Sequence, residues 1–165
     1  MAAHPRETLF AFESPDDSPG FLLWQVSHLW QRKIKAALDP LELTHVQFVL
    51  LASVAWLGHA DDALTQVKLA AHARTDVMMT SKVLRTLESK GLIRRAPHPD
   101  DTRANVLATT VEGDALLSRA VRVVEVVDQE FFGGLGAQIG AFNSALSSLR
   151  TADMLQRSTP ESAHR

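Results

Sequence analysis

Between residues 64 and 109, the hydrophobic pattern changes from the period of helices to the period of strands. A short helical pattern over 64–70 and a second one over 76–89 are separated by a brief turn. Two strand-like pieces, 92–95 and 105–108, then enclose a turn rich in proline and aspartate, as in a long hairpin. Two short helices joined by a tight turn and followed by a hairpin predict a winged helix-turn-helix, which presents its second helix to the major groove of DNA.

Helical periodicity also marks both flanks of this motif. We expect a first helix over about 21–38, a central buried helix that begins behind a capping box of Thr44 and Gln47, and two further helices after residue 110. In the last helix, apolar side chains step by four, three, four and three residues, a narrow seam suited to pairing with another helix. We name these residues the apolar seam: Leu135, Ile139, Phe142, Leu146 and Leu149. The predicted fold class is therefore mainly α, with a small wing of two to three β-strands.

Charge is distributed unevenly along the chain. The net charge is −2, but residues 64–95 contain seven lysines and arginines against Asp76 and Glu88, so this segment carries +5 and the rest of the chain −7. Such a basic block inside an acidic protein indicates a focused anionic partner. The alternative is chance clustering on a solvated face.

Several classes of protein are disfavoured by what the sequence contains. It has no cysteine, which excludes disulfides, thiolate metal sites and thiol chemistry, and its histidines lack paired ligand spacing, so we expect no metal and no cofactor. No phosphate-binding glycine loop, G-x-S-x-G or HExxH motif is present, so we do not expect an enzyme. No apolar run approaches the roughly 20 residues of a membrane helix, and the first residues do not resemble a secretory signal. We therefore expect a cytoplasmic protein.

The second helix of the motif has two faces. Val77, Thr80, Leu84 and Leu87 recur at three and four residues, so we expect them to pack inward. The opposite side carries hydroxyls, two cations and an apolar group able to contact a thymine methyl. We therefore assign DNA contact to this side and to the turn before it: Thr75, Met78, Met79, Ser81, Lys82 and Arg85. The alternative is that Met78 or Met79 fills the core.

The hairpin adds further candidates for DNA contact. Arg103 lies near its tip, where a guanidinium can reach the narrow, electronegative minor groove, and Asp101 can brace that guanidinium. The alternative is an arginine paired across the hairpin for stability alone. Arg94 and Arg95 lie on the strand that leaves the second helix and suit phosphate contacts, which position a protein without specifying sequence.

Three motifs in this order resemble those of the MarR-type (multiple antibiotic resistance regulator) transcription factors. Residues 43–48, LTHVQF, are similar to the family's L-T-x-x-Q-F, and residues 87–93, LESKGLI, to its L-E-x-K-G-L-I. Residues 101–113 resemble its D-x-R…L-T-x-x-G wing, although Thr109 stands where the family usually has leucine. The resemblance covers about residues 21–150.

This resemblance implies a sequence-specific, DNA-binding transcriptional regulator, usually a ligand-responsive repressor, that binds a pseudo-palindromic operator as a homodimer. It implies a helical dimerisation region formed by 21–42 with 110–155 and a DNA-binding domain over 43–109. Residues 1–20 contain three of the seven prolines and an acidic pair, so we expect an irregular arm there, and we expect a polar tail over 156–165. The rival interpretation is a dimeric interaction or small-molecule-sensing module whose winged helix no longer binds DNA.

Members of this family often respond to a small aromatic or phenolic acid held between the dimer helices and the DNA-binding lobe. In this chain the resemblance implies that such an effector pocket is lined by Trp24, His28, Trp30 and Trp56. An ordinary role in the core or an interface is the alternative for these side chains.

Overall fold

The computed structural model describes residues 12–59, 63–99, 101 and 103–158, with side chains to residue 152. The chain divides into two compact units, and the boundary lies between Val127 and Asp128. Each unit is described by itself below. The expected arm over 1–20 and the expected polar tail fall partly outside the described residues. Where they are described, a short 3-10 turn occupies Pro15–Asp17, and the last helix continues to Ser158.

The first unit begins with helices whose starts are fixed by local caps. The Ser18 hydroxyl accepts a hydrogen bond from the Phe21 amide at the start of α1, and Thr44 and Gln47 form the predicted capping box at the start of α2. A 3-10 turn, η2, joins the two helices, and Glu42 at its end has a φ of +53°. The bounds are α1 Pro19–Leu38, η2 Asp39–Leu41 and α2 His45–Gly58.

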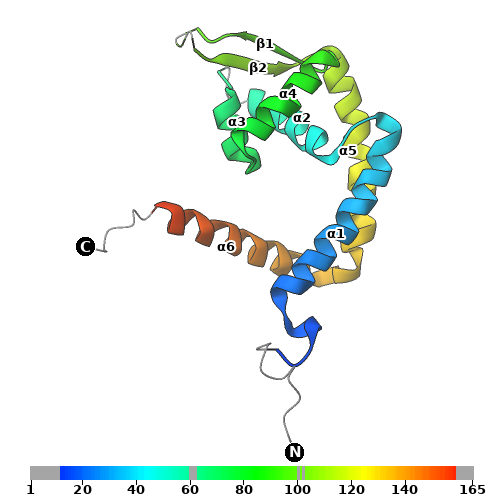
Figure 1. Cartoon of the computed structure of the whole chain (residues 1–165). Helices are drawn as coiled ribbons and strands as arrows, with labels where there is room; N and C mark the ends of the chain where they lie inside the picture. Colours follow the sequence, from blue (N-terminus) through cyan, green and yellow to red (C-terminus); the bar gives the residue numbers. More distant parts are fainter. Residues whose placement is uncertain (1–11, 60–62, 100, 102, 159–165) are drawn as a thin grey trace, which may run out of the picture. The chain divides into compact units, whose positions relative to one another are not determined.

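The predicted winged helix-turn-helix is confirmed by the elements that follow. Thr65 caps α3 by accepting from the Lys68 amide, and Asp76 caps α4. The antiparallel hairpin runs alongside these two helices, with β1 in contact with α4 and β2 in contact with α3 (Figure 1). An isolated bridge between Thr65 and Val106 adds a short third segment to the wing. The bounds are α3 Gln66–Ala73, α4 Val77–Ser89, β1 Ile93–Pro97, β2 Asn105–Thr109 and α5 Val111–Phe132.

Helix α2 is the centre of the first unit, as its apolar sequence predicts. It packs against α1, α3, α4 and β2. One expectation for it is wrong: Trp56 is not buried but 76% exposed, because it lies on the side of α2 opposite Leu50 and Val54. The fully buried side chains come from every element around α2: Ile34, Leu38, Leu50, Leu51, Leu64, Leu69, Leu84, Leu87 and Leu107.

Two glycines hold the wing against the helices. Gly91 has a φ of +72° and ends α4, and the next amide, that of Leu92, donates to the Leu87 carbonyl, which closes the helix in a Schellman motif. Gly113 lies in the first turn of α5, where a Cβ atom would overlap the Leu92 carbonyl oxygen and lie 2.9 Å from its carbonyl carbon. Thr110 caps α5, because its hydroxyl accepts from the Gly113 amide at 3.0 Å, and the same hydroxyl donates to the Gly91 carbonyl at 2.6 Å. The base of the wing therefore lies tight against the start of α5.

The second unit contains the end of α5, a 3-10 segment η3 (Gly133–Gln138) and α6 (Ile139–Ser158). The predicted seam does not lie wholly on one helix. Leu135 belongs to η3, because Gly136 adopts non-helical angles that interrupt the helix before Ile139. Within this unit, the rings of Phe132 and Phe142 lie 5.9 Å apart.

Among the described residues, no single helix has both the length and the apolar character needed to cross a membrane. The segments Pro19–Leu41 and His45–Gly58 meet that criterion jointly, on length and composition alone, and are bent by 76° where they meet.

Candidate nucleic-acid interface

The start of α4 is held by side chains from the turn before it. The Asp76 carboxylate accepts from the Met78 and Met79 amides, both at 2.9 Å. The hydroxyls of Thr75 and Thr80 lie 2.7 Å apart and share a hydrogen bond. Thr75 was expected to contact DNA, and the structure places its hydroxyl on the buried Thr80 instead of leaving it free.

The two faces of α4 follow the predicted pattern with one exception. Thr80, Leu84 and Leu87 are buried, but Val77, expected to pack inward, is 44% exposed because it lies in the first turn at the edge of the core. Both methionines are exposed, so neither fills the core. We call Met78, Ser81, Lys82 and Arg85 the outer face of α4.

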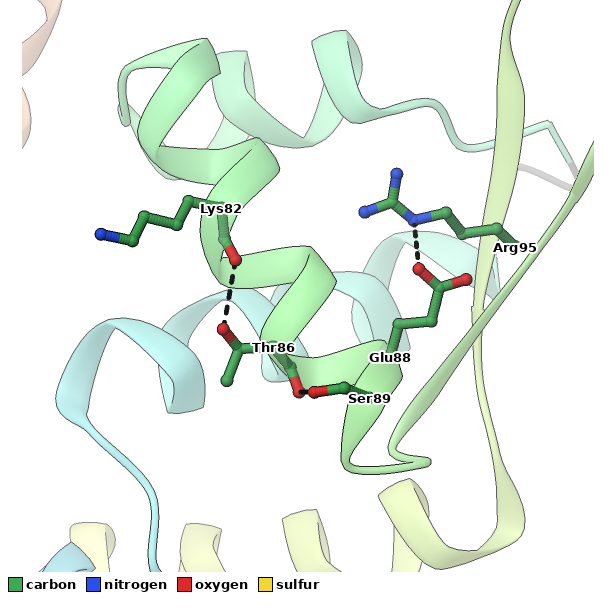
Figure 2. Close-up of polar contacts among 5 residues, drawn as sticks. All are labelled: Lys82, Thr86, Glu88, Ser89 and Arg95. Carbon is green, nitrogen blue, oxygen red and sulfur yellow. Dashed lines mark hydrogen bonds and ion pairs between the residues drawn. The ribbon is translucent and has the colours of Figure 1, made fainter.

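The outer face carries two exposed cations. Lys82 and Arg85 are both exposed and lie about one turn apart. Figure 2 shows Lys82 extending from the side of α4 opposite to Glu88 and the wing, while its backbone carbonyl accepts from the Thr86 hydroxyl at 3.2 Å. The outer face therefore combines the apolar side chain of Met78 at the N-terminal end of α4, the Ser81 hydroxyl and two exposed positive charges.

The wing tip keeps its arginine exposed. Asp101 does not take the predicted role of brace for the Arg103 guanidinium: its Oδ1 accepts from the Arg103 backbone amide at 2.9 Å. The Asp101 amide in turn donates to His98 Nδ1 at 3.2 Å. These bonds shape the turn and present the Arg103 side chain to solvent.

The two arginines of β1 differ in a way that the sequence does not reveal. Arg94 is exposed, as a phosphate contact requires, whereas the Arg95 side chain is 20% exposed and its Nε lies 3.1 Å from Glu88 Oε2 (Figure 2). The contact is an ion pair rather than an aligned hydrogen bond, because Arg95 Nε and Nη2 are buried without a hydrogen-bond partner among the described residues. Arg95 therefore ties the wing to α4, and the phosphate role expected for it is not supported.

Replacing Glu88 with glutamine should lower the free energy of unfolding by about 1–2 kcal/mol, because it leaves a largely buried guanidinium without a compensating charge. The value is smaller than for a fully buried pair, since Glu88 is in contact with water. Urea unfolding of the Glu88→Gln, Arg95→Met and double variants measures the coupling. Equal stability of Glu88→Gln and the unsubstituted protein would show that the pair contributes nothing.

A second long-range contact joins the end of α4 to the turn after α1. Lys90 Nζ donates to the Glu42 carbonyl at 2.6 Å, across 48 residues of sequence. Neither this contact nor the Glu88–Arg95 pair has a sequence signal, since both depend on how separate elements pack.

A groove of about 960 Å³ runs along α1 to the start of α2 and contains two of the four predicted effector residues. The rings of Trp24 and His28 meet edge to face at 4.4 Å on its wall. Trp30 contacts His45 from outside the lining, and the exposed Trp56 does not line the groove either. We call this cavity the α1 groove, and its lining also includes residues that the sequence analysis did not assign to an effector: Gln25, Val26, Leu29, Gln31, Arg32, Lys35, Asp39, Thr44 and His45.

Comparison with known proteins agrees with this geometry. A family profile described as the MarR family matches residues 43–104. The uncharacterized HTH-type transcriptional regulator YdcH of Bacillus subtilis (strain 168) is 47% identical over 121 residues, which cover 73% of this chain and 82% of that protein. The HTH-type transcriptional repressor Rv2887 of Mycobacterium tuberculosis (strain ATCC 25618 / H37Rv) is 33% identical over 74% of this chain and 86% of its own length.

A solved structure shows the same fold. A mutant MarR from E. coli, crystallised in complex with operator DNA, has a TM-score of 0.72 and 25% identity to this chain, and the match covers 84% of this chain and 99% of that one. The winged helix-turn-helix, its exposed cations and these relatives lead to one conclusion: the chain belongs to the MarR family and is a transcriptional regulator, not an enzyme.

Proposed function

We propose that this regulator binds a pseudo-palindromic operator as a homodimer and represses transcription in the cytoplasm. The observation that carries the proposal is the outer face of α4, where Lys82 and Arg85 are both exposed and Lys82 extends from the side opposite to the wing (Figure 2). A helix of this kind fits the major groove, and the exposed Arg103 of the wing reaches toward the minor groove beside it. The complex of E. coli MarR with operator DNA and the repressor name of the mycobacterial relative support this assignment.

The exposed apolar side chains support a homodimer. In the single chain the first half of α1 exposes a run of large apolar residues, and α6 exposes part of the apolar seam. Exposed apolar residues gathered on one helix mark an interaction site, and each of these two helices carries such a group. A second copy of the chain would cover the exposed apolar residues that do not line the α1 groove: Phe21, Leu22 and Leu23 on α1, and Ile139, Leu146 and Leu149 on α6. Paired copies would hold two α4 helices in major grooves about 10 base pairs apart.

The test is binding to duplexes selected from a random pool, followed by fluorescence anisotropy at increasing salt. We expect a palindromic site and an affinity that falls about a thousandfold or more between roughly 50 and 200 mM salt, because phosphate neutralisation releases counterions. Arg103→Ala should weaken binding chiefly at sites with A·T-rich flanks, and Lys33→Ala, which changes an exposed charge on α1, should not. A folded protein indifferent to every duplex at low salt would establish the rival function, a sensing module without DNA binding.

We further propose that the α1 groove binds a small aromatic acid. Trp24 and His28 offer aromatic surfaces, and Val26 and Leu29 add apolar ones. Arg32 supplies the charge for a carboxylate, since the ammonium of Lys35 already pairs with Asp39 at 2.6 Å. An effector bound here would alter DNA affinity if it bound the DNA-free arrangement of the dimer better.

A thermal-shift screen of small aromatic acids tests this site. At least one acid should raise the Tm of the unsubstituted protein, and Arg32→Gln should abolish the shift. Lys33→Gln is the matched control, because it removes a neighbouring exposed charge that does not line the groove. A shift that survives Arg32→Gln, or a screen without any shift, would contradict the assignment.

A further inference from the structure

The N-terminal end of α4, which we call its leading end, is unusually apolar for a helix that approaches DNA. Val77, Met78 and Met79 are consecutive and all exposed, and Met78, at 81%, is among the most exposed large apolar side chains that the structure describes. Single exposed apolar residues are common on protein surfaces. Three consecutive ones at the end of a helix form an apolar patch, which marks a surface that a partner covers.

The backbone at this end of α4 is already occupied. Backbone amides in the first turn of a helix often bind a phosphate. Here the amides of Met78 and Met79 both donate to the Asp76 carboxylate instead. The negative charge of Asp76 also lies against the positive end of the helix dipole. The leading end of α4 is therefore a poor anion site, and what it offers to a ligand is the apolar surface of its side chains.

The positive charges lie further along the same face. Lys82 and Arg85 follow Met78 by four and seven residues, so all three project from one side of α4. In a helix-turn-helix the first residues of the second helix contact base edges in the major groove. The apolar group that base edges present there is the 5-methyl of thymine.

We propose that Met78 determines operator specificity by packing its side chain on the 5-methyl group of one thymine in each half-site. This inference rests on the proposed DNA-binding function and adds the base and the atom that are read. The contact is made by dispersion and by removal of apolar surface from water, so it needs no hydrogen-bond partner on the side chain. Deoxyuridine forms the same base pair as thymidine but lacks the 5-methyl group. Because Met78 contacts the methyl group alone, replacing that thymidine with deoxyuridine should weaken binding.

The experiment uses the full chain and the operator found by selection. At one position at a time, the two equivalent thymidines of the half-sites are both replaced by deoxyuridine. For the unsubstituted protein, one symmetric replacement should weaken binding about tenfold or more, as expected for one lost methyl contact in each half-site. In Met78→Ala the same replacement should change affinity less than twofold, and Met78→Leu should restore the methyl dependence. Val77→Ala, which alters an exposed apolar neighbour that is not assigned to DNA contact, should keep the full penalty.

Two results would overturn the inference while leaving the proposed function intact. One is tight operator binding that no deoxyuridine replacement weakens, and the other is a deoxyuridine penalty that Met78→Ala retains in full. Absence of binding to any duplex would refute the proposed function together with this inference. Circular dichroism melting of each variant separates a lost contact from a lost fold, since Met78 is exposed and its replacement should leave the Tm unchanged.

Discussion

Gly113→Ala should lower the free energy of unfolding by about 3 kcal/mol, the upper part of the range for overpacked sites. The added Cβ would overlap the Leu92 carbonyl oxygen, which is a backbone atom and cannot rotate away as a side chain can. The same oxygen accepts the Thr110 amide at 3.1 Å, so relief of the overlap would also break the bond that joins the wing to α5. Urea unfolding followed by circular dichroism measures the change.

Gly58→Ala is the matched control for this substitution. Gly58 is the last residue of α2, and a Cβ atom there meets nothing within 4 Å. Alanine should therefore be neutral or should raise stability by up to about 1 kcal/mol, because it restricts the unfolded chain. If the two alanine variants unfold at the same urea concentration, the close approach of α5 to Leu92 does not constrain the fold.

Arg85→Ala should weaken operator binding by about 1–3 kcal/mol, which corresponds to roughly five- to 150-fold, and should relax the choice of base at one position in each half-site. The guanidinium is exposed on the outer face of α4, and arginine pairs with guanine in the major groove through two hydrogen bonds. Anisotropy titrations on the selected operator and on single-base variants of it measure both effects.

Arg95→Met provides the contrast. Its guanidinium is held on Glu88, so its loss should change the stability of the protein and leave the salt dependence of DNA binding unaltered. An Arg85→Ala variant that binds every operator variant as the unsubstituted protein does would remove Arg85 from the contact surface.

Much of the fold could be predicted because its signals are local. The capping box of Thr44 and Gln47 depends on atoms three residues apart, and it is confirmed. The caps that Asp76 and Thr110 form in the structure are equally local. The change of period after Gly91 likewise marks where helix gives way to hairpin. These features fix the order of elements, and the order defines the winged helix-turn-helix.

The remaining features depend on contacts between elements, which periodicity does not contain. Arg95 and Arg94 are adjacent and chemically identical, yet strand alternation turns one toward Glu88 and the other toward solvent. Trp56 lies in an almost uniformly apolar helix, so its sequence context could not show which side faces out. Leu135 kept the seam's spacing, but the backbone angles of Gly136 place it outside the helix.

The hydrogen bond from Lys90 to the Glu42 carbonyl has a mechanical consequence. Glu42 lies between Asp39 and Thr44, which both line the α1 groove, and Lys90 caps the trailing end of α4. A molecule that displaced this turn would act on the C-terminal end of α4 through this hydrogen bond, and the buried leucines of α4 would not have to move. Lys90 therefore connects the turn beside the α1 groove to the C-terminal end of α4.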